Sequence, residues 1–139
     1  MSTPTAAFAF KAYSFSEVEL HMDLFDEKGS LDLNFAPSGE YYAKEGLYML
    51  HFVFTANQGE EERSLIKIVC NAVFEFKQPL DITEIPDYFF PNSLAIVFPY
   101  VRAFVSTVTL QANLSAPILI PTLNLTSLQS VLKANTLAK

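Results

Sequence analysis

A long stretch with almost no charge constrains the fold of this chain more than any other feature. Between Tyr88 and Leu132 the one formally charged side chain is that of Arg102. So much contiguous apolar surface is not left in water by a soluble protein, because exposed patches of this kind mark interfaces or aggregation hazards. We therefore expect the rest of the chain, or another copy of it, to cover this stretch.

The charges are divided unevenly along the sequence. All 15 Asp and Glu residues lie at or before Asp87, and the net charge is −6. A nucleic-acid footprint needs clustered Lys and Arg, so no nucleic-acid partner is expected. The acidic first part suits solubility or the attraction of basic partners. At 139 residues, half of them hydrophobic, the chain is predicted to form a single domain over residues 1–139.

The sequence predicts a soluble, cytoplasmic protein. The N-terminus has no basic region followed by an unbroken apolar run, so a secretory signal is not expected. Residues 94–110 form the best membrane-span candidate, but Pro99 and Arg102 interrupt them and they are shorter than the roughly 20 apolar residues that a span requires. Cys70 is the one cysteine, which excludes a disulfide framework and a thiolate zinc site.

Period-two alternation predicts four strands before the charge-poor stretch. They cover residues 8–22, 31–35, 47–56 and 64–77, and the second is expected to stop at Pro37. In the first strand Tyr13 and Phe15 break the alternation, which indicates a bulge or burial on both faces. Consecutive strands with tight connections predict an antiparallel sheet with one well-covered face.

Two helices are predicted after the strands. The first covers residues 94–111, capped by Asn92 or Ser93, with Pro99 at its start or at a kink. It is apolar almost all round, which is typical of a helix buried on every side, and one sheet can cover only one side of it. A proline-bracketed connector then leads to a second helix, ending near Asn135, with an apolar stripe made of Leu125, Leu128, Val131 and Leu132.

No pattern in the sequence indicates catalysis. His21 and His51 are far apart and without partners at metal-ligand spacing, so structural roles are expected for both. Cys70 alternates with apolar residues and is expected in the core. We predict no enzyme, no catalytic residues, no metal and no cofactor. Arg102 has two interpretations: its stem packs while its guanidinium reaches solvent or caps carbonyls, or it pairs with an acidic group from the sheet half of the sequence in a subunit contact.

The segment PNSLAIVFPYVRAFVSTVTLQANLSAPILIPTLNLTSL, residues 91–128, resembles the C-terminal half of the SecB protein-export chaperone family. FPYVR at residues 98–102 and the connector leading to Leu123, Asn124, Leu125 and Leu128 carry the likeness. LDLN at residues 31–34 and FVFTANQGEE at residues 52–61 match the family's strands and acidic hairpin. The resemblance extends from about residue 13 to residue 132.

This resemblance implies an α+β subunit: a four-stranded antiparallel sheet, a long helix packed on it, and a second, shorter outer helix. It implies a homotetramer, built as a dimer of dimers, with the long helices between the sheets. It also implies a holdase that uses no nucleotide, binds unfolded or precursor proteins in hydrophobic grooves, and keeps them competent for export.

Mapped by position, the resemblance assigns three sets of residues. The peptide-binding groove would contain Met22, Leu24, Phe25, Leu31, Leu33, Phe35, Leu125, Leu128, Val131 and Leu132. The subunit interface would contain Tyr100, Arg102, Phe104, Val105 and Val108. An acidic partner-binding surface would contain Glu17, Glu19, Glu60, Glu61 and Glu62.

Several functions stay open at this point. Family members that deliver clients to the SecA motor use a C-terminal tail, and the basic ending LKANTLAK does not match it, so SecA is not a firm expectation. Other members are chaperones of toxin–antitoxin systems. Outside the family, the apolar surplus would also suit a carrier of a small apolar ligand, or an assembly module whose apolar surface is consumed by its own subunits.

Overall fold

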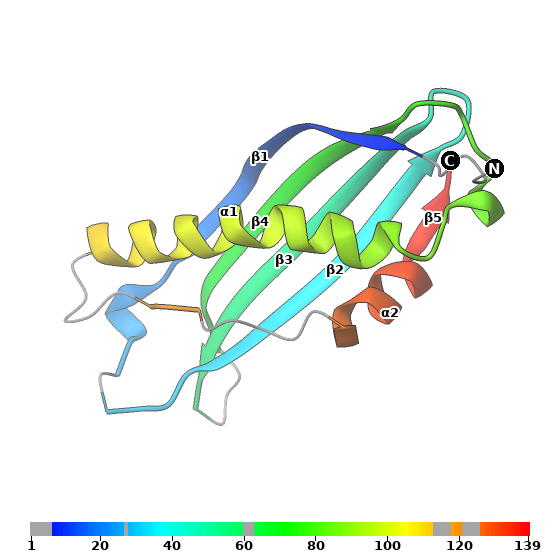
Figure 1. The fold of residues 1–139 in the computed structure, drawn as a ribbon. Coiled ribbons are helices and arrows are strands. Elements are labelled where there is room, and N and C mark those ends of the chain that lie inside the picture. Colours follow the sequence, from blue (N-terminus) through cyan, green and yellow to red (C-terminus); the bar gives the residue numbers. More distant parts are fainter. Residues whose placement is uncertain (1–6, 27, 60–62, 113–117, 121–125) are drawn as a thin grey trace.

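The protein forms one mixed sheet with two helices on one face (Figure 1). The computed structural model describes residues 7–26, 28–59, 63–112, 118–120 and 126–139. The sheet has five strands in the order β1-β4-β3-β2-β5. Along the chain the elements are β1 (Phe8–Leu20), η1 (Met22–Leu24), β2 (Asp32–Tyr42), β3 (Leu47–Gln58), β4 (Arg63–Phe76), η2 (Ile82–Glu84), α1 (Phe89–Gln111), α2 (Thr126–Ala134) and β5 (Thr136–Ala138).

The α+β class is confirmed, whereas the prediction of a purely antiparallel, four-stranded sheet is wrong. The first four strands pair antiparallel, but β5 adds a fifth that runs parallel to β2, with Thr136 opposite Gly39 and Ala138 opposite Tyr41. Three residues are too few to show a period in the sequence. Their strand conformation comes from the open edge of β2 that they meet.

β2 also runs through the proline that was expected to end it. Pro37 lies opposite Phe52 in an unbroken register with β3 that continues to Tyr42. A proline is tolerated in an edge strand because its missing N–H can face the side that has no partner. β5 pairs only with Gly39–Tyr41, so the edge beside Pro37 is free of a strand partner among the described residues.

The predicted bulge in β1 is confirmed and is in fact double. The register with β4 shifts between Phe10 and Ala12 and again between Phe15 and Glu17. As a result, Tyr13 and Phe15 lie on the same face of the sheet as Phe10, and all three rings turn toward α1. The interrupted alternation in the sequence therefore reflects a strand that keeps its apolar side chains on one face by inserting extra residues.

α1 begins at Phe89, five residues before the predicted start, and the predicted cap at Asn92 or Ser93 is wrong. Ser93 is buried and its hydroxyl donates to the Phe90 carbonyl within the helix. Phe89 and Phe90 are buried too, so packing rather than a polar cap sets the helix start. The second helix is confirmed in α2, although Leu125 lies outside the described residues.

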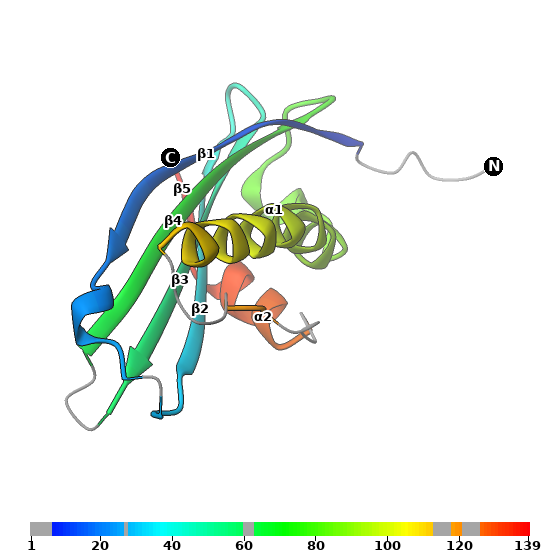
Figure 2. The same ribbon diagram turned by 90° about the vertical axis from the view of Figure 1, so that its left-hand side faces the viewer.

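Aromatic rings fill the layer between the sheet and α1. The fully buried Phe89 ring lies 4.7 Å from Tyr48 and 4.9 Å, 5.6 Å and 5.0 Å from Phe8, Phe74 and Phe76, measured between ring centroids. Edge-to-face contacts of this kind add stability beyond the buried area. Figure 2 shows α1 and α2 on the same side of the curved sheet, with the other face bare, so the prediction of one covered face is confirmed.

Within the part of the chain that the structure describes, α1 is buried on its sheet side and keeps exposed side chains on the opposite side. Among the described residues it is long and apolar enough to meet a membrane-span criterion of length and composition, which a core helix of a soluble protein also meets. Its inner residues, such as Leu94, Val101 and Val105, are fully buried under the sheet, while Tyr100 and Leu110 are exposed. The exposed side of α1 is therefore an apolar surface of the kind that, from the sequence, we expect another part of the chain, or another copy of it, to cover.

Candidate functional site

The linker between β1 and β2 presents one apolar side chain to solvent and tucks two others inward. Met22 and Phe25 are half-buried against the core, whereas Leu24 is 44% exposed. The linker is tied to the end of β3 by Gln58, whose side chain accepts a hydrogen bond from Asp26 N at 2.9 Å and donates to Asp26 O at 2.7 Å. Nothing in the local pattern of the sequence singled out Gln58 for this role.

The start of β2 supplies a row of half-buried apolar side chains. Leu31, Leu33 and Phe35 alternate on the face that carries the helices. The Phe35 ring lies 5.4 Å from Phe54 and 6.1 Å from Phe98, so it joins the sheet to α1. A hollow of about 480 Å³ opens beside this row, lined by Leu31, Asp32, Leu33, Asn34, Asn57 and Gly59. The row is therefore packed at its base and reachable from solvent.

α2 packs on β2 and shows three different degrees of burial along its apolar stripe. Leu128 is half-buried, Val131 is 39% exposed, and Leu132 is fully buried. Leu132 is therefore a core residue here and is not part of the accessible surface of α2.

A short chain of hydrogen bonds holds the end of α2 and β5 on the sheet. The buried Tyr48 hydroxyl donates to Thr136 Oγ1 at 2.5 Å, and Thr136 Oγ1 donates to the Leu132 carbonyl at 2.7 Å. The Tyr48 ring crosses Gly39, where a Cβ atom would collide with it. Burial raises the pKa of Tyr48 to about 12, so its hydroxyl stays a donor at neutral pH. We call this arrangement the Tyr48 clamp.

Together these elements carry the apolar surface that the resemblance assigns to client binding, and we call this surface the client groove. It consists of the linker, which follows the end of β1, the first half of β2, and the outer side of α2, which lies on the helix side of the sheet (Figure 1). Its solvent-accessible members among the described residues are Met22, Leu24, Phe25, Leu31, Leu33, Phe35, Leu128 and Val131. Partly exposed aliphatic and aromatic side chains of this kind bind many apolar sequences without requiring one.

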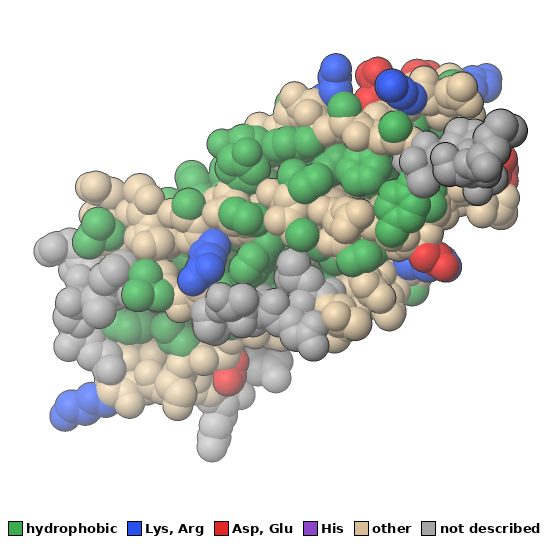
Figure 3. Space-filling model, viewed as in Figure 1, with side chains coloured by type: hydrophobic (Ala, Val, Ile, Leu, Met, Phe, Trp, Pro, Cys, Tyr) green, Lys and Arg blue, Asp and Glu red, His purple; other side chains and the backbone are tan. Residues whose placement is uncertain are grey.

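The residues predicted at the subunit interface separate into an inner and an outer group. Val105 is fully buried under the sheet, and Phe104 stacks on Phe15 of the same chain at 4.0 Å between ring centroids. Tyr100 stacks on Tyr13 at 4.3 Å but is still 39% exposed. Hydrophobic side chains gather over α1 and neighbouring β1 (Figure 3). This exposed surface suits a subunit contact, which stays a prediction.

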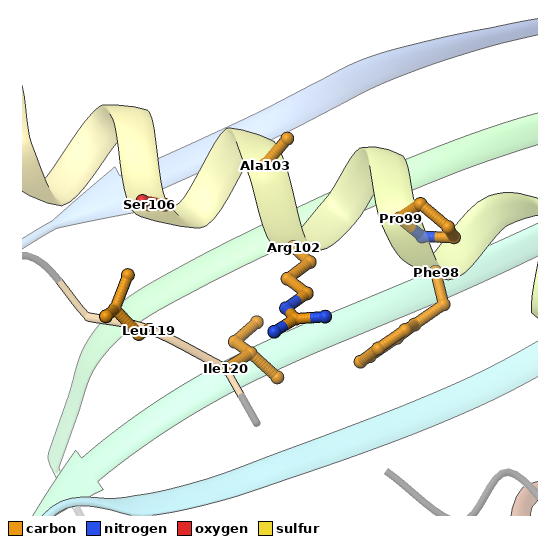
Figure 4. A pocket seen from close by; sticks show the side chains of 7 residues that line it. All are labelled: Phe98, Pro99, Arg102, Ala103, Ser106, Leu119 and Ile120. Carbon is orange, nitrogen blue, oxygen red and sulfur yellow. The ribbon is translucent and has the colours of Figure 1, made fainter. Parts of the chain in front are cut away.

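Arg102 stands beside a separate pocket of about 430 Å³ on the exposed side of α1. The pocket is lined by Phe98, Pro99, Arg102, Ala103, Ser106, Leu119 and Ile120 (Figure 4). The connector that closes it is positioned by the buried Thr109, whose hydroxyl accepts a hydrogen bond from Ile118 N at 2.8 Å. The sequence predicted the connector but gave no sign of this contact.

The predicted acidic surface lies in part on the bare face of the sheet. Glu17 and Glu19 point away from the helices, and Glu17 forms an ion pair with Lys67 at 3.3 Å. That pair offsets part of the negative charge that was expected to attract a partner. Glu60, Glu61 and Glu62 lie outside the described residues.

His51 belongs to a row of polar side chains on the same bare face of the sheet. His51 Nε2 lies 3.0 Å from Glu40, and its Nδ1 lies 2.6 Å from Asn71. Hydrogen bonds from the Tyr42 hydroxyl and from His51 lower the pKa of Glu40. The predicted structural role of His51 is therefore confirmed.

Cys70 lies in the core of the protein. Burial raises the pKa of the Cys70 thiol to about 11, so the thiolate is absent at neutral pH and the predicted core role is confirmed. Within the described ranges, no three His, Cys, Asp or Glu side chains come together where they could hold a metal ion.

Comparisons with known proteins identify the fold of this chain. No family model matches the sequence. An uncharacterized protein of Methanocaldococcus jannaschii, MJ0357, is 27% identical over 133 residues, covering 91% of this chain and 85% of that protein. The SecB-like chaperone Rv1957 of Mycobacterium tuberculosis, solved with a ChAD peptide from the Rv1956 HigA1 antitoxin, matches with a TM-score of 0.65 and 15% identity, covering 84% of this chain and 88% of that one. A Streptococcus agalactiae protein of unknown function matches with a TM-score of 0.47 and 11% identity. The chain therefore has a SecB-like fold.

Proposed function

We propose that this protein is a molecular chaperone that works without ATP, a holdase that binds unfolded segments of other proteins in the client groove. The observation that carries the proposal is the row of partly exposed apolar side chains on the linker, β2 and α2. This row lies on a fold that a SecB-like chaperone shares. Alternating and flexible side chains suit a surface that has to accept many sequences.

The same proposal includes the setting in which the protein acts. We propose a cytoplasmic homotetramer, a dimer of dimers, that is not an enzyme and inserts into no membrane. The exposed aromatic surface of α1 and β1 supports self-association, because such a surface is costly in water. Clients would be unfolded or precursor proteins kept competent for export, with the SecA motor as one candidate recipient.

Suppression of client aggregation tests the proposal. The groove variant Leu24→Ser/Val131→Ser removes two exposed apolar groups without opening the core, so it is expected to fold and to suppress aggregation less than the wild type. The control Leu137→Ser removes an even more exposed apolar group from β5, outside the client groove, and is expected to act like the wild type. A wild-type protein that protects none of several slow-folding clients would contradict the proposal.

A second candidate client is a peptide segment of an antitoxin. The solved neighbour carries a peptide from the HigA1 antitoxin, which favours this class of client over others for the same fold. The discriminating measurement is the affinity for peptides from antitoxins encoded beside this protein's gene, compared with export precursors. A clear preference for the antitoxin peptide would assign the protein to a toxin–antitoxin system.

A carrier of a small apolar ligand is the alternative from a different class. Its pocket would be the hollow beside Arg102, which at about 430 Å³ lies within the range of small-molecule sites. Native mass spectrometry separates the two functions. A monomer that retains a lipid-sized adduct would favour the carrier, whereas a tetramer without an adduct would favour the chaperone.

A further inference from the structure

The pocket beside Arg102 combines an apolar hollow with one cation. Its remaining lining is apolar apart from the hydroxyl of Ser106, and Leu119 is 70% exposed at its edge. Figure 4 shows the Arg102 side chain leaving α1 toward the connector, with its guanidinium between Ile120 and the ring of Phe98. A ligand in the hollow would therefore meet a positive charge at its edge.

This cation has no partner within the described part of the chain. No ion pair or hydrogen bond joins Arg102 to another described residue, whereas Lys67, Lys133 and Lys139 each pair with a carboxylate. The acidic residues all precede the segment that builds the pocket. The five N–H donors of the guanidinium are thus available to an acceptor that comes from outside.

We propose that this pocket binds a client segment in which a carboxylate stands next to an aliphatic or aromatic side chain. The apolar side chain enters the hollow, and the Asp or Glu carboxylate of the client accepts hydrogen bonds from the Arg102 guanidinium. This inference rests on the proposed chaperone function and specifies the client chemistry at one end of the binding surface. The planar guanidinium can hold a carboxylate through two parallel hydrogen bonds, which an ammonium group does not reproduce.

The position of the pocket favours a polypeptide as its occupant. Phe98 lines the pocket, and its buried ring packs 6.1 Å from the ring of Phe35 of the client groove, so the pocket and the groove share core packing at this point. In this proposal, a client bound at β2 places a neighbouring part of its own chain at Arg102. A small amphiphile would fill only the pocket and would gain nothing from this continuity.

Two fluorescent peptides with blocked ends test the inference. They share one apolar sequence and differ at a single position, Asp in one and Asn in the other. We expect the wild type to bind the Asp peptide about 10-fold more tightly, because a charge-assisted hydrogen bond is stronger than a neutral one. The preference is expected to weaken with added salt, since Arg102 is exposed.

Variants of the protein test whether Arg102 causes the preference for the Asp peptide. In Arg102→Gln both peptides are expected to bind with the affinity that the wild type has for the Asn peptide, and Arg102→Lys is expected to keep part of the preference. The control Lys44→Gln removes another exposed cation, in the turn between β2 and β3, and is expected to keep all of the preference. Leu119→Ala is expected to weaken both peptides while leaving their ratio unchanged.

The outcomes separate this inference from the proposed function. Equal affinities for the two peptides, or a preference that persists in Arg102→Gln, would overturn the inference and leave the chaperone function standing. A change of molar mass in Arg102→Gln, measured by light scattering, would place Arg102 in a subunit contact and also overturn it. If neither peptide binds and no client is protected from aggregation, both the inference and the function fail.

Discussion

Removing the hydroxyl of Thr136 is expected to loosen the whole C-terminal part of the fold. Thr136→Val keeps the size and the branched shape of the side chain, so β5 retains its strand preference. The substitution takes away the acceptor of the Tyr48 hydroxyl, which is buried in a residue with 0% exposure. A buried polar group without a partner costs about 1–3 kcal/mol, and we expect a loss of this size in the free energy of unfolding.

A double-mutant cycle tests the origin of that loss. Tyr48→Phe removes the donor, and the Thr136 hydroxyl still donates to the Leu132 carbonyl, so this single change is expected to cost only about 1 kcal/mol. In Tyr48→Phe/Thr136→Val both partners are apolar and nothing is left unsatisfied. We therefore expect the double variant to be no less stable than Thr136→Val alone, giving a coupling energy of about 1 kcal/mol or more.

The assay combines urea unfolding with hydrogen exchange. Urea midpoints give the free energies, and exchange shows whether residues 126–139 open before the rest of the sheet, as release of the Tyr48 clamp requires. Thr55→Val on the bare face of β3 is the control, expected to stay within about 0.5 kcal/mol of the wild type. Strictly additive losses in the double variant, or a Thr136→Val loss below about 0.5 kcal/mol, would refute the reasoning.

Three further predictions concern the stability of the fold. Phe89→Ala opens a cavity among buried rings and is expected to cost about 3–5 kcal/mol, measured by urea unfolding. Cys70 and Tyr48 keep their protons in the folded protein past their ordinary pKa values of 9.0 and 10.0. These raised pKa values stabilise the folded state, and the stabilisation is complete below pH 9. It is lost as the pH rises to about 11 for Cys70 and about 12 for Tyr48, so Cys70→Ala should remove the part of the loss that occurs up to about pH 11. The lowered pKa of Glu40 stabilises the folded state above pH 4.5, and this stabilisation is lost as the pH falls below that value. The free energy of unfolding of Glu40→Gln, measured by urea unfolding, should therefore decrease less in acid than that of the wild type.

Loosening the Tyr48 clamp also bears on function. Leu132 is the one apolar residue of the α2 stripe that is fully buried among the described residues, and the clamp holds its carbonyl through Thr136. Opening of α2 would add Leu132 to the client groove and lengthen the apolar surface offered to a client. Under the proposed function, the stability of the clamp would therefore set how much of the groove is available at rest.

Much of the fold follows from local patterns. Alternation predicted β1, β3 and β4 to within a few residues, and the interruption at Tyr13 and Phe15 predicted the bulge, because burial on one face imposes a period of two on any strand. The same logic predicted the half-buried row of Leu31, Leu33 and Phe35. Each of these features depends on residues close together in the chain.

Other features depend on contacts between distant segments, which no local period records. Pro37 sits within β2 because the neighbouring edge is open there, and β5 is a strand because three residues reach that edge beside Gly39. Gln58 holds the linker from 32 residues away, and Tyr48 holds Thr136 from 88 residues away.

Arg102 illustrates both what the sequence determines and what the tertiary structure decides. The sequence determined that it is the one charge in a long apolar stretch, and therefore that its surroundings are special. The tertiary structure decided what surrounds it, because the connector at Leu119 and Ile120 folds back beside α1 to form the pocket. Local composition dictates which side chains avoid water, whereas the path of the chain determines which of them meet.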